Sequence, residues 1–385
     1  MTPALLATLV AFAMTSDTGS GPFAPLAQFL RESVAHGAFP GAVVAVGRRD
    51  TVLFETGVGG LTYDPGPPPD AHTLYDLASL TKVVGLTTVV MMLVEEHRLD
   101  LDAPVTRYVP AFAAGGDSVT IRQLLTHASG LPAWLPLYRD VHSRAELFAR
   151  VNATPLEARP GSRMVYSDLG AILLTEAVEH LTGERLDALL AQRVFRPLGM
   201  SDTRFNPPAG LRSRIAPTEN DPWRGRVLRG EVHDENAAVM DGVSGHAGLF
   251  STAADLVTFA QMMLRFGRTA SGTQLIDSAT IAAFTRCQDP AFSSRALGWD
   301  TPSQGSSAGD LLSPHAYGHT GFTGTSIWID PAKDLFVILL TNRVYPTRQN
   351  EQILKVRPEV TNLAVRGAEA PADSAPPVDG RGPGI

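Results

Sequence analysis

Ser79 and Lys82 have the residue types and the spacing of a nucleophile and its activating partner. They begin and end a Ser-Leu-Thr-Lys tetrapeptide that opens an apolar run continuing to Val94. If that run is helical, residues i and i+3 share a face, so the Lys82 ammonium can reach the Ser79 hydroxyl. A serine hydroxyl is a poor nucleophile unless a neighbouring base or cation helps to remove its proton. The spacing therefore predicts covalent catalysis through Ser79.

The tetrapeptide alone is a weak signal. The chain has three lysines, Lys82, Lys333 and Lys355, and average serine usage places a serine three residues before one of them about one time in five. In the alternative interpretation, Ser79 caps a core helix and Lys82 lies on the solvated first turn. The apolar neighbours of Lys82 disfavour that alternative, because an unpaired ammonium among them would be costly.

A second candidate group is Tyr166-Ser167-Asp168, which precedes a predicted amphipathic helix closed by Gly183. A phenol is a useful general base only if its pKa falls well below about 10, and a nearby cation produces such a shift. Lys82 is the obvious cation. The alternative is a core tyrosine followed by Asp168 as an ordinary helix N-cap, and the motif by itself favours that alternative about two to one.

A third candidate group is His319-Thr320-Gly321, within a glycine-rich segment that leads into a predicted strand. Glycines allow close approach of the backbone, and an edge strand offers free N–H groups to a substrate carbonyl. The His319 imidazole could donate a hydrogen bond to substrate or assist the phenol. The alternative is a glycine-rich turn with a surface histidine.

The elements that must position these groups are sheet-like at both ends of the chain and helical in the middle. Strands are expected at 41–46 and 51–55, joined by a Gly-Arg-Arg-Asp turn, and as an antiparallel pair at 326–330 and 335–340. Helices are expected at 23–35, at 120–125, after a capping box at 143–146, and at 169–181. This order predicts an α/β fold of the α+β type, with an antiparallel sheet of about five strands flanked by helices. A mostly helical insertion at roughly 100–230 would leave the active site in the cleft between the two parts.

Composition limits the class of protein. At 385 residues, with 44% apolar and 18% charged residues, the chain is an ordinary globular protein. Its net charge of −7 argues against nucleic acid as a partner. The single Cys287 leaves the redox compartment open. The apolar stretch 5–13 predicts a signal-like leader over 1–22, with export to the periplasm or the exterior, ahead of one domain over 23–365 and a disordered tail over 366–385.

Two further classes of site are disfavoured. The run that ends at Val94 is too short for a membrane span. His233, Asp234 and His246 offer no compact ligand set, so we expect them to order a loop and not to bind metal. The chemistry of an activated serine requires no cofactor. The oligomeric state stays open.

The three candidate groups together resemble the serine β-lactamase and penicillin-binding-protein superfamily on its class C-like branch, over residues 23–348. That branch also holds DD-peptidases, esterases and muropeptide amidases. The segment 124–132, Leu-Leu-Thr-His-Ala-Ser-Gly-Leu-Pro, is similar to a stretch common in that superfamily, as are Pro197-Leu-Gly-Met200 and the segment 248–253. The resemblance implies the β-lactamase/transpeptidase fold.

The resemblance also implies roles for individual residues. Ser79 would form an acyl-enzyme, with Tyr166 as the base and Lys82 as its electrostatic partner, and water would release the acyl group. The reverse assignment of Tyr166 and Lys82 stays open. Backbone N–H groups of Ser79 and Phe322 would form the oxyanion hole. Asp168, Thr320, Gly321 and Phe322 would contact substrate, and His319 would serve catalysis.

Two departures from the family pattern narrow the expected activity. Asp168 stands where class C enzymes have asparagine, and His319 stands where β-lactamases usually have lysine, leaving at most a titratable cation. Both changes predict poor β-lactamase activity. The segments 232–248 and 342–346 are similar to a subset that includes muramyl-peptide amidases, which makes peptidoglycan-derived peptides a reasonable substrate. The prediction is a serine hydrolase of an ester or amide. The alternatives are a promiscuous carboxylesterase and a non-catalytic sensor that binds penicillin or cell-wall peptides.

Overall fold

The computed structural model of the chain describes residues 21–113 and 115–371. Most of the predicted leader and most of the predicted tail therefore lie outside the described residues. Among those residues, no helix is both long and apolar enough to cross a membrane.

The central element is a five-stranded antiparallel sheet, which confirms the predicted fold class. Its strands follow one another in the order β2 (Thr51–Gly59), β1 (Gly41–Arg48), β10 (Leu335–Thr341), β9 (Ser326–Asp330) and β8 (Tyr317–Thr320). The first hairpin turns more tightly than predicted, because β1 continues through Gly47 and Arg48 and leaves only Arg49 and Asp50 in the turn.

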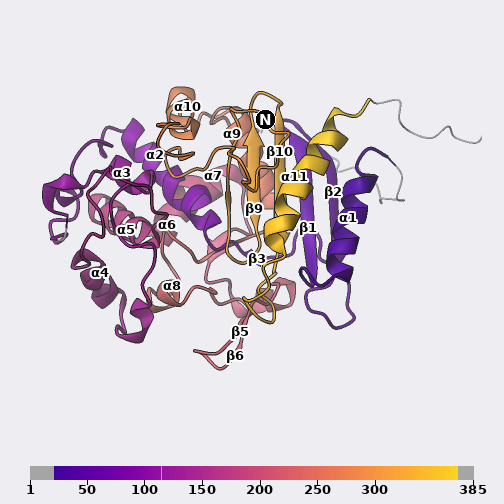
Figure 1. The fold of residues 1–385 in the computed structure, drawn as a ribbon, viewed down its shortest axis with the longest axis horizontal. Coiled ribbons are helices and arrows are strands. Elements are labelled where there is room, and N and C mark those ends of the chain that lie inside the picture. The colour runs from indigo at the N-terminus through magenta and orange to yellow at the C-terminus, as the bar shows by residue number, and fades with distance from the viewer. Residues whose placement is uncertain (1–20, 114, 372–385) are drawn as a thin grey trace, which may run out of the picture.

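Both faces of the sheet are covered, because successive side chains of a strand point to opposite faces. In β1, Ala42, Val44 and Val46 pack with helices α1 (Ala24–Ala35) and α11 (Ile353–Glu369), while Val43 and Ala45 join the main core. On that inner side α9 (Ala253–Leu264) contacts β1, β9 and β10. Figure 1 shows α1 and α11 on the outer side of the sheet and the helical region on the other side.

The predicted tail begins too early. Residues 366–369 are the last residues of α11, so the predicted boundary at 366 is wrong. Val360, Ala364 and Val365 repeat at helical spacing and are buried against the sheet, which keeps the chain helical beyond the predicted boundary. The helix ends before Pro371, because a proline pushes its preceding residue into an extended conformation.

The regular elements in the middle of the chain are mainly helices, separated by loops. The helices of this middle part are α3 (Ile121–Leu125), α4 (Arg144–Asn152), α5 (Asp168–Thr182), α6 (Leu186–Leu190), α7 (Arg196–Leu198) and, just beyond it, α8 (Glu235–Val239) and α10 (Ser278–Thr285). Among the short strands, β7 (Leu249–Ser251) pairs with β3 (Tyr75–Asp76) on one side and with β4 (Arg204–Phe205) on the other. Strand β5 (Asn220–Asp221) pairs with β6 (Arg226–Val227).

At two helices, the observed N-terminal cap differs in detail from the cap that the sequence suggests. Only half of the capping box at Ser143 forms, because Glu146 accepts from the backbone N–H of His142 in place of that of Ser143. Helix α5 is capped by Ser167, whose hydroxyl accepts from the Gly170 N–H, so Asp168 is the first helical residue and not the N-cap. Gly183 closes α5 in a left-handed conformation, as predicted.

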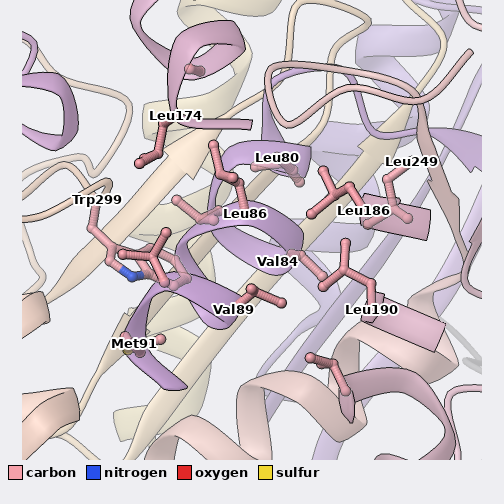
Figure 2. Close-up of a cluster of buried hydrophobic side chains, with 14 of the residues drawn as sticks. Leu80, Val84, Leu86, Val89, Met91, Leu174, Leu186, Leu190, Leu249 and Trp299 are labelled. Carbon is pink, nitrogen blue, oxygen red and sulfur yellow. The ribbon is translucent and has the colours of Figure 1, made fainter. Parts of the chain in front are cut away.

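The segment that carries Lys82 lies inside the main core. It is helical from Leu80, takes a π-helical form over Lys82–Thr87, and continues as α2 (Thr88–Glu95). Figure 2 shows side chains of this segment packed against α5, α6, β7 and Trp299. The segment contributes Leu80, Val84, Leu86, Val89 and Met91, and the elements around it contribute Leu174, Leu186, Leu190 and Leu249. A close-packed surrounding of this kind fixes the backbone from which Lys82 projects.

Candidate active site

The nucleophile candidate Ser79 sits in a turn between β3 and the core helical segment, where its side chain is partly exposed. The preceding Ala78 has a φ of +46°, a left-handed conformation that costs energy for a residue with a side chain. The Asp76 carboxylate holds this turn by accepting hydrogen bonds from the backbone N–H groups of Ala78 at 2.8 Å and His233 at 2.7 Å. The turn thereby presents Ser79 to the solvent side of an otherwise buried segment.

Lys82 lies one helical turn further on and is buried, with 3% of its surface exposed. Its Nζ donates to Ser79 Oγ at 2.9 Å and to the His246 carbonyl at 3.0 Å, and it lies 2.6 Å from Asp168 Oδ1. Burial alone would lower the pKa of Lys82, but the Asp168 carboxylate and Tyr166 raise it to about 12. Lys82 is therefore a permanent cation at neutral pH and not a free base.

The start of α5 brings Tyr166 and Asp168 to the same place. The Tyr166 ring centroid is 5.0 Å from Lys82 Nζ, and its buried hydroxyl makes no hydrogen bond of ordinary geometry within the described residues. Ser167 anchors this corner, since its backbone N–H donates to His127 Nδ1 at 3.1 Å and its hydroxyl donates to the Pro132 carbonyl at 2.6 Å. The phenol is thus fixed beside the Ser79–Lys82 pair.

His319, at the edge of the sheet on β8, reaches the same group, with its ring 5.8 Å from the Tyr166 ring. Its Nδ1 lies 2.8 Å from the Thr320 carbonyl. A carbonyl only accepts, so Nδ1 carries the proton. Burial, followed by the charges of Arg295 and Lys82, holds the pKa of His319 well below its usual value. The imidazole is therefore neutral, and its Nε2 has no hydrogen-bond partner within the described residues.

The three residues after His319 serve the site in different ways. Thr320 supplies the carbonyl that orients the imidazole. Gly321 is buried where a Cβ would collide with the Thr325 hydroxyl and the Leu77 carbonyl, so only glycine fits. Phe322 is 49% exposed and lines the cleft, whereas Thr320 and Gly321 do not.

Two backbone N–H groups face no acceptor. Neither Ser79 nor Phe322 donates a main-chain hydrogen bond within residues 21–113 and 115–371. The carbonyl of Phe322 accepts from Arg343 Nε at 2.8 Å, and that of Gly321 accepts from Arg357, which fixes this turn. Both N–H groups therefore remain available to a substrate carbonyl oxygen, as the predicted oxyanion hole requires.

A cleft of about 350 Å³ lies over these groups. Polar and aromatic side chains from separate parts of the chain line it, namely Ser79, Trp134, Tyr166, Asp168, His233, Asp234, Glu235, His246, Phe322 and Arg348. The structure thus gathers Tyr166 and Asp168 around Lys82, which contacts the Ser79 hydroxyl, and places His319 beside Tyr166. A hydroxyl beside an ammonium, a phenol and free N–H donors can carry out nucleophilic acyl transfer.

The family model described as Beta-lactamase matches residues 26–360. The chain belongs to the beta-lactamase family. It is accordingly a serine hydrolase of the β-lactamase fold, which confirms the resemblance drawn from its motifs.

Curated relatives in this family have related names. The chain is 36% identical over 321 residues to a protein of Salmonella typhi named "Putative D-alanyl-D-alanine carboxypeptidase", covering 75% of this chain and 73% of that one. The protein from Salmonella schwarzengrund (strain CVM19633) gives the same values and carries the same name.

Solved structures share the fold. A penicillin-binding protein homologue from Caulobacter crescentus aligns with a TM-score of 0.71 at 22% identity, covering 90% of this chain and 99% of that one. EstCE1, described as a hydrolase with promiscuous acyltransferase activity, also gives 0.71 at 22% identity, covering 88% and 98%.

The histidines and acids near the cleft form ion pairs and hydrogen bonds. His246 Nε2 lies 2.8 Å from Asp234 Oδ1, and His233 Nε2 lies 2.9 Å from Glu219 Oε2. Among the described residues, no group of three or more His, Cys, Asp or Glu is arranged to hold a metal ion. Burial alone would raise the pKa of Asp234, but the facing His246 brings it below its usual range.

Sequence reasoning missed two residues that lie against the Tyr166 ring. The His127 ring lies 4.5 Å from the Tyr166 ring, and the Arg295 guanidinium carbon lies 5.2 Å from the same ring. His127 lies within the segment 124–132, which resembles a stretch common in the family, but that resemblance assigned no role to the histidine. Arg295 has no local motif that could have identified it.

Glu219 should stabilise the protein in a pH-dependent manner. Burial would raise the pKa of Glu219, but hydrogen bonds from His233 and Arg348 lower it to about 2. A carboxyl with a depressed pKa contributes stability that is present above its ordinary pKa near 4.5 and is lost as pH falls towards 2. Glu219→Gln should therefore lower the free energy of unfolding by roughly 2 kcal/mol at pH 7, and progressively less below pH 4.5.

Urea unfolding across this pH range checks the prediction. Glu231→Gln is the matched control, because Glu231 pairs with Arg226 at the exposed surface, where ion pairs contribute little. An equal loss of stability at pH 7 and at pH 3 would contradict the assigned role of Glu219.

Proposed function

We propose that this protein hydrolyses peptidoglycan-derived peptides through an acyl-enzyme on Ser79, releasing a C-terminal D-alanine. The observation that carries the proposal is the 2.9 Å contact between Lys82 Nζ and Ser79 Oγ beneath a cleft with two free N–H donors. The apolar stretch 5–13 supports export to the compartment where such peptides occur.

The proposed reaction has two stages. Tyr166 reacts as the phenolate and accepts the Ser79 proton as Oγ bonds to the substrate carbonyl carbon, while Lys82 stabilises the negative charge on these groups. The N–H groups of Ser79 and Phe322 bind the oxyanion, and the proton passes to the departing amine as the C–N bond breaks. Water then attacks the ester carbonyl carbon while Tyr166 accepts a proton from it. The proton passes to Ser79 Oγ as the ester C–O bond breaks, which frees Ser79.

Two features of the site disfavour a β-lactam, and a third provides a donor for the carboxylate of a peptide. Asp168 only accepts hydrogen bonds, and neutral His319 holds an acceptor nitrogen, so neither would hold a β-lactam carboxylate. Arg348 is a cleft-lining guanidinium whose Nε and Nη2 bind Glu219 and Glu235, while its Nη1 makes no hydrogen bond within the described residues. The Nη1 donors can receive a terminal carboxylate. The name of the Salmonella relatives supports the same substrate class.

A carboxylesterase is the second candidate, and exposed aromatic rings favour it. Trp134 and Phe322, which are 42% and 49% exposed, stand on the lining of the cleft and could accommodate an apolar acyl group. The hydrolase EstCE1, with its promiscuous acyltransferase activity, is compatible with this candidate, although its likeness to this chain is one of fold.

A substrate panel distinguishes these functions. Purified protein is incubated with a peptide ending in D-alanyl-D-alanine, a muramyl-peptide, a p-nitrophenyl ester and a penicillin. Release of D-alanine with negligible penicillin turnover is the expected result. Ester turnover without peptide turnover would replace the proposal with the carboxylesterase, and persistent adducts without any product would indicate a sensor.

Arg348→Met adds a test of the substrate class on the same panel. Loss of a charge-assisted hydrogen bond to carboxylate should lower kcat/KM for the D-alanyl peptide relative to the neutral ester by about 10-fold or more. Arg348→Lys, which keeps the charge, should recover part of that ratio. An unchanged ratio in Arg348→Met would show that this guanidinium does not bind the substrate carboxylate.

A further inference from the structure

Arg295 places a second cation against the catalytic tyrosine. It comes from the loop between α10 and β8, and its side chain is 13% exposed. Its guanidinium carbon lies 5.2 Å from the Tyr166 ring centroid, close to the 5.0 Å that separates Lys82 Nζ from the same point. The Tyr166 ring therefore has positive charge near it from two separate elements.

The Arg295 guanidinium lacks close partners of its own. Its Nε and Nη1 atoms are buried without a hydrogen-bond partner within the described residues, and its ion pair with Asp300 spans 3.8 Å. Asp300 Oδ1 already accepts from the Ser294 hydroxyl and the Thr301 N–H. A buried cation with unsatisfied donors is costly unless a neighbouring anion compensates it.

The groups that face Tyr166 show that a Tyr166 phenolate is the anion that could compensate Arg295. Lys82 is balanced by Asp168 at 2.6 Å. His127, which follows α3, has its ring 4.5 Å from Tyr166, and His319 on β8 has its ring 5.8 Å away. Burial, followed by the charge of Arg295, lowers the pKa of both histidines well below 6.5, so both are neutral. Arg295 is the cation facing the phenol whose charge is not closely paired within the described residues.

We propose that Arg295 is a positioning residue that stabilises the phenolate form of Tyr166. A cation over an aromatic ring is attracted more strongly when the ring carries a phenolate charge than when it is neutral. Arg295 keeps its own protons throughout. The phenolate oxygen takes the Ser79 proton as the Oγ–carbon bond forms, and later returns it to the leaving group. This role rests on the acyl-enzyme mechanism proposed above.

The pH dependence of ester hydrolysis tests the proposal. In Arg295→Met, kcat/KM for a p-nitrophenyl ester should fall about 30-fold near pH 6 and recover to within about 3-fold of wild type near pH 10, where solvent removes the phenolic proton unaided. Arg295→Lys should restore most of the loss. Arg286→Met, which removes an exposed arginine at the end of α10, should behave as wild type. A loss that is uniform across pH and is not rescued by lysine would overturn the proposal.

A second readout needs no substrate. The ultraviolet absorbance of tyrosinate is titrated in wild type, Arg295→Met, Arg295→Gln and Arg295→Lys, each minus its Tyr166→Phe counterpart. The difference signal should appear at higher pH in the two neutral variants and near the wild-type position in Arg295→Lys. Coincident titrations of all four proteins would overturn the proposal even if the protein had no hydrolase activity. Absent turnover with displaced titrations would instead refute the proposed function alone.

Discussion

Ser79→Ala should hydrolyse the best substrate of the panel at least about 10⁴-fold more slowly than wild type, because no other group can form the acyl bond. The folded structure should persist, since Ser79 is partly exposed and Lys82 keeps its contacts with Asp168 and the His246 carbonyl. Steady-state kinetics measures the loss. Intact-mass spectrometry with a slowly released substrate should find an acyl adduct on wild type and none on the variant.

Ser303→Ala is the matched control, because Ser303 is exposed in the loop before β8. It should retain wild-type turnover and the adduct. Hydrolysis by Ser79→Ala at the wild-type rate would rule out every covalent mechanism through this residue, and unchanged thermal unfolding ensures that a loss of rate is chemical.

Lys82→Met should lower kcat/KM by about 10³-fold and also destabilise the protein. Catalysis falls because the developing charge on Ser79 and Tyr166 loses its nearest cation. Stability falls by roughly 2–4 kcal/mol because Asp168, which is largely buried, is left without its partner. Lys355→Met, at an exposed position on α11, should change neither quantity.

A double variant separates the two effects of Lys82. Adding Asp168→Asn to Lys82→Met removes the orphaned carboxylate, so stability should recover while activity stays low. Recovery of activity with stability would mean that Lys82 acts only as a structural counter-ion. In wild type, the raised pKa keeps the Lys82 ion pair intact below about pH 10.5, and its contribution to stability is lost as pH rises through about 12.

The parts of the site that could be predicted are those that local chain geometry determines. One helical turn separates Ser79 from Lys82, so their 2.9 Å contact follows from sequence spacing once a helix is assumed. The two hairpins of the sheet were likewise predictable, because short apolar runs bounded by turn residues predict strands that are buried on both faces. The family resemblance supplied what spacing could not, namely that Tyr166 and His319 belong to the same site.

The remaining features depend on contacts between distant segments. Asp168 pairs with Lys82 across 86 positions of sequence, and in the sequence it had the pattern of an ordinary helix N-cap. The state of His319 is set by its burial and by charges on other elements, so its neutrality could not be inferred from a glycine-rich turn. Arg295 joins the group only because its loop packs beside β8.

The strand order described for the sheet has a consequence for biosynthesis. Strand β1 lies between β2 and β10, so one of its edges is completed only when residues 335–341 have left the ribosome. Until then, the apolar hairpin of β1 and β2 presents an unpaired edge, the feature that promotes intermolecular association of nascent chains. Because β1 and β10 lie far apart in the sequence, their late pairing also slows productive folding. A nascent chain that stops before β10 therefore carries an apolar strand, β1, that lacks the neighbour that would pair with it.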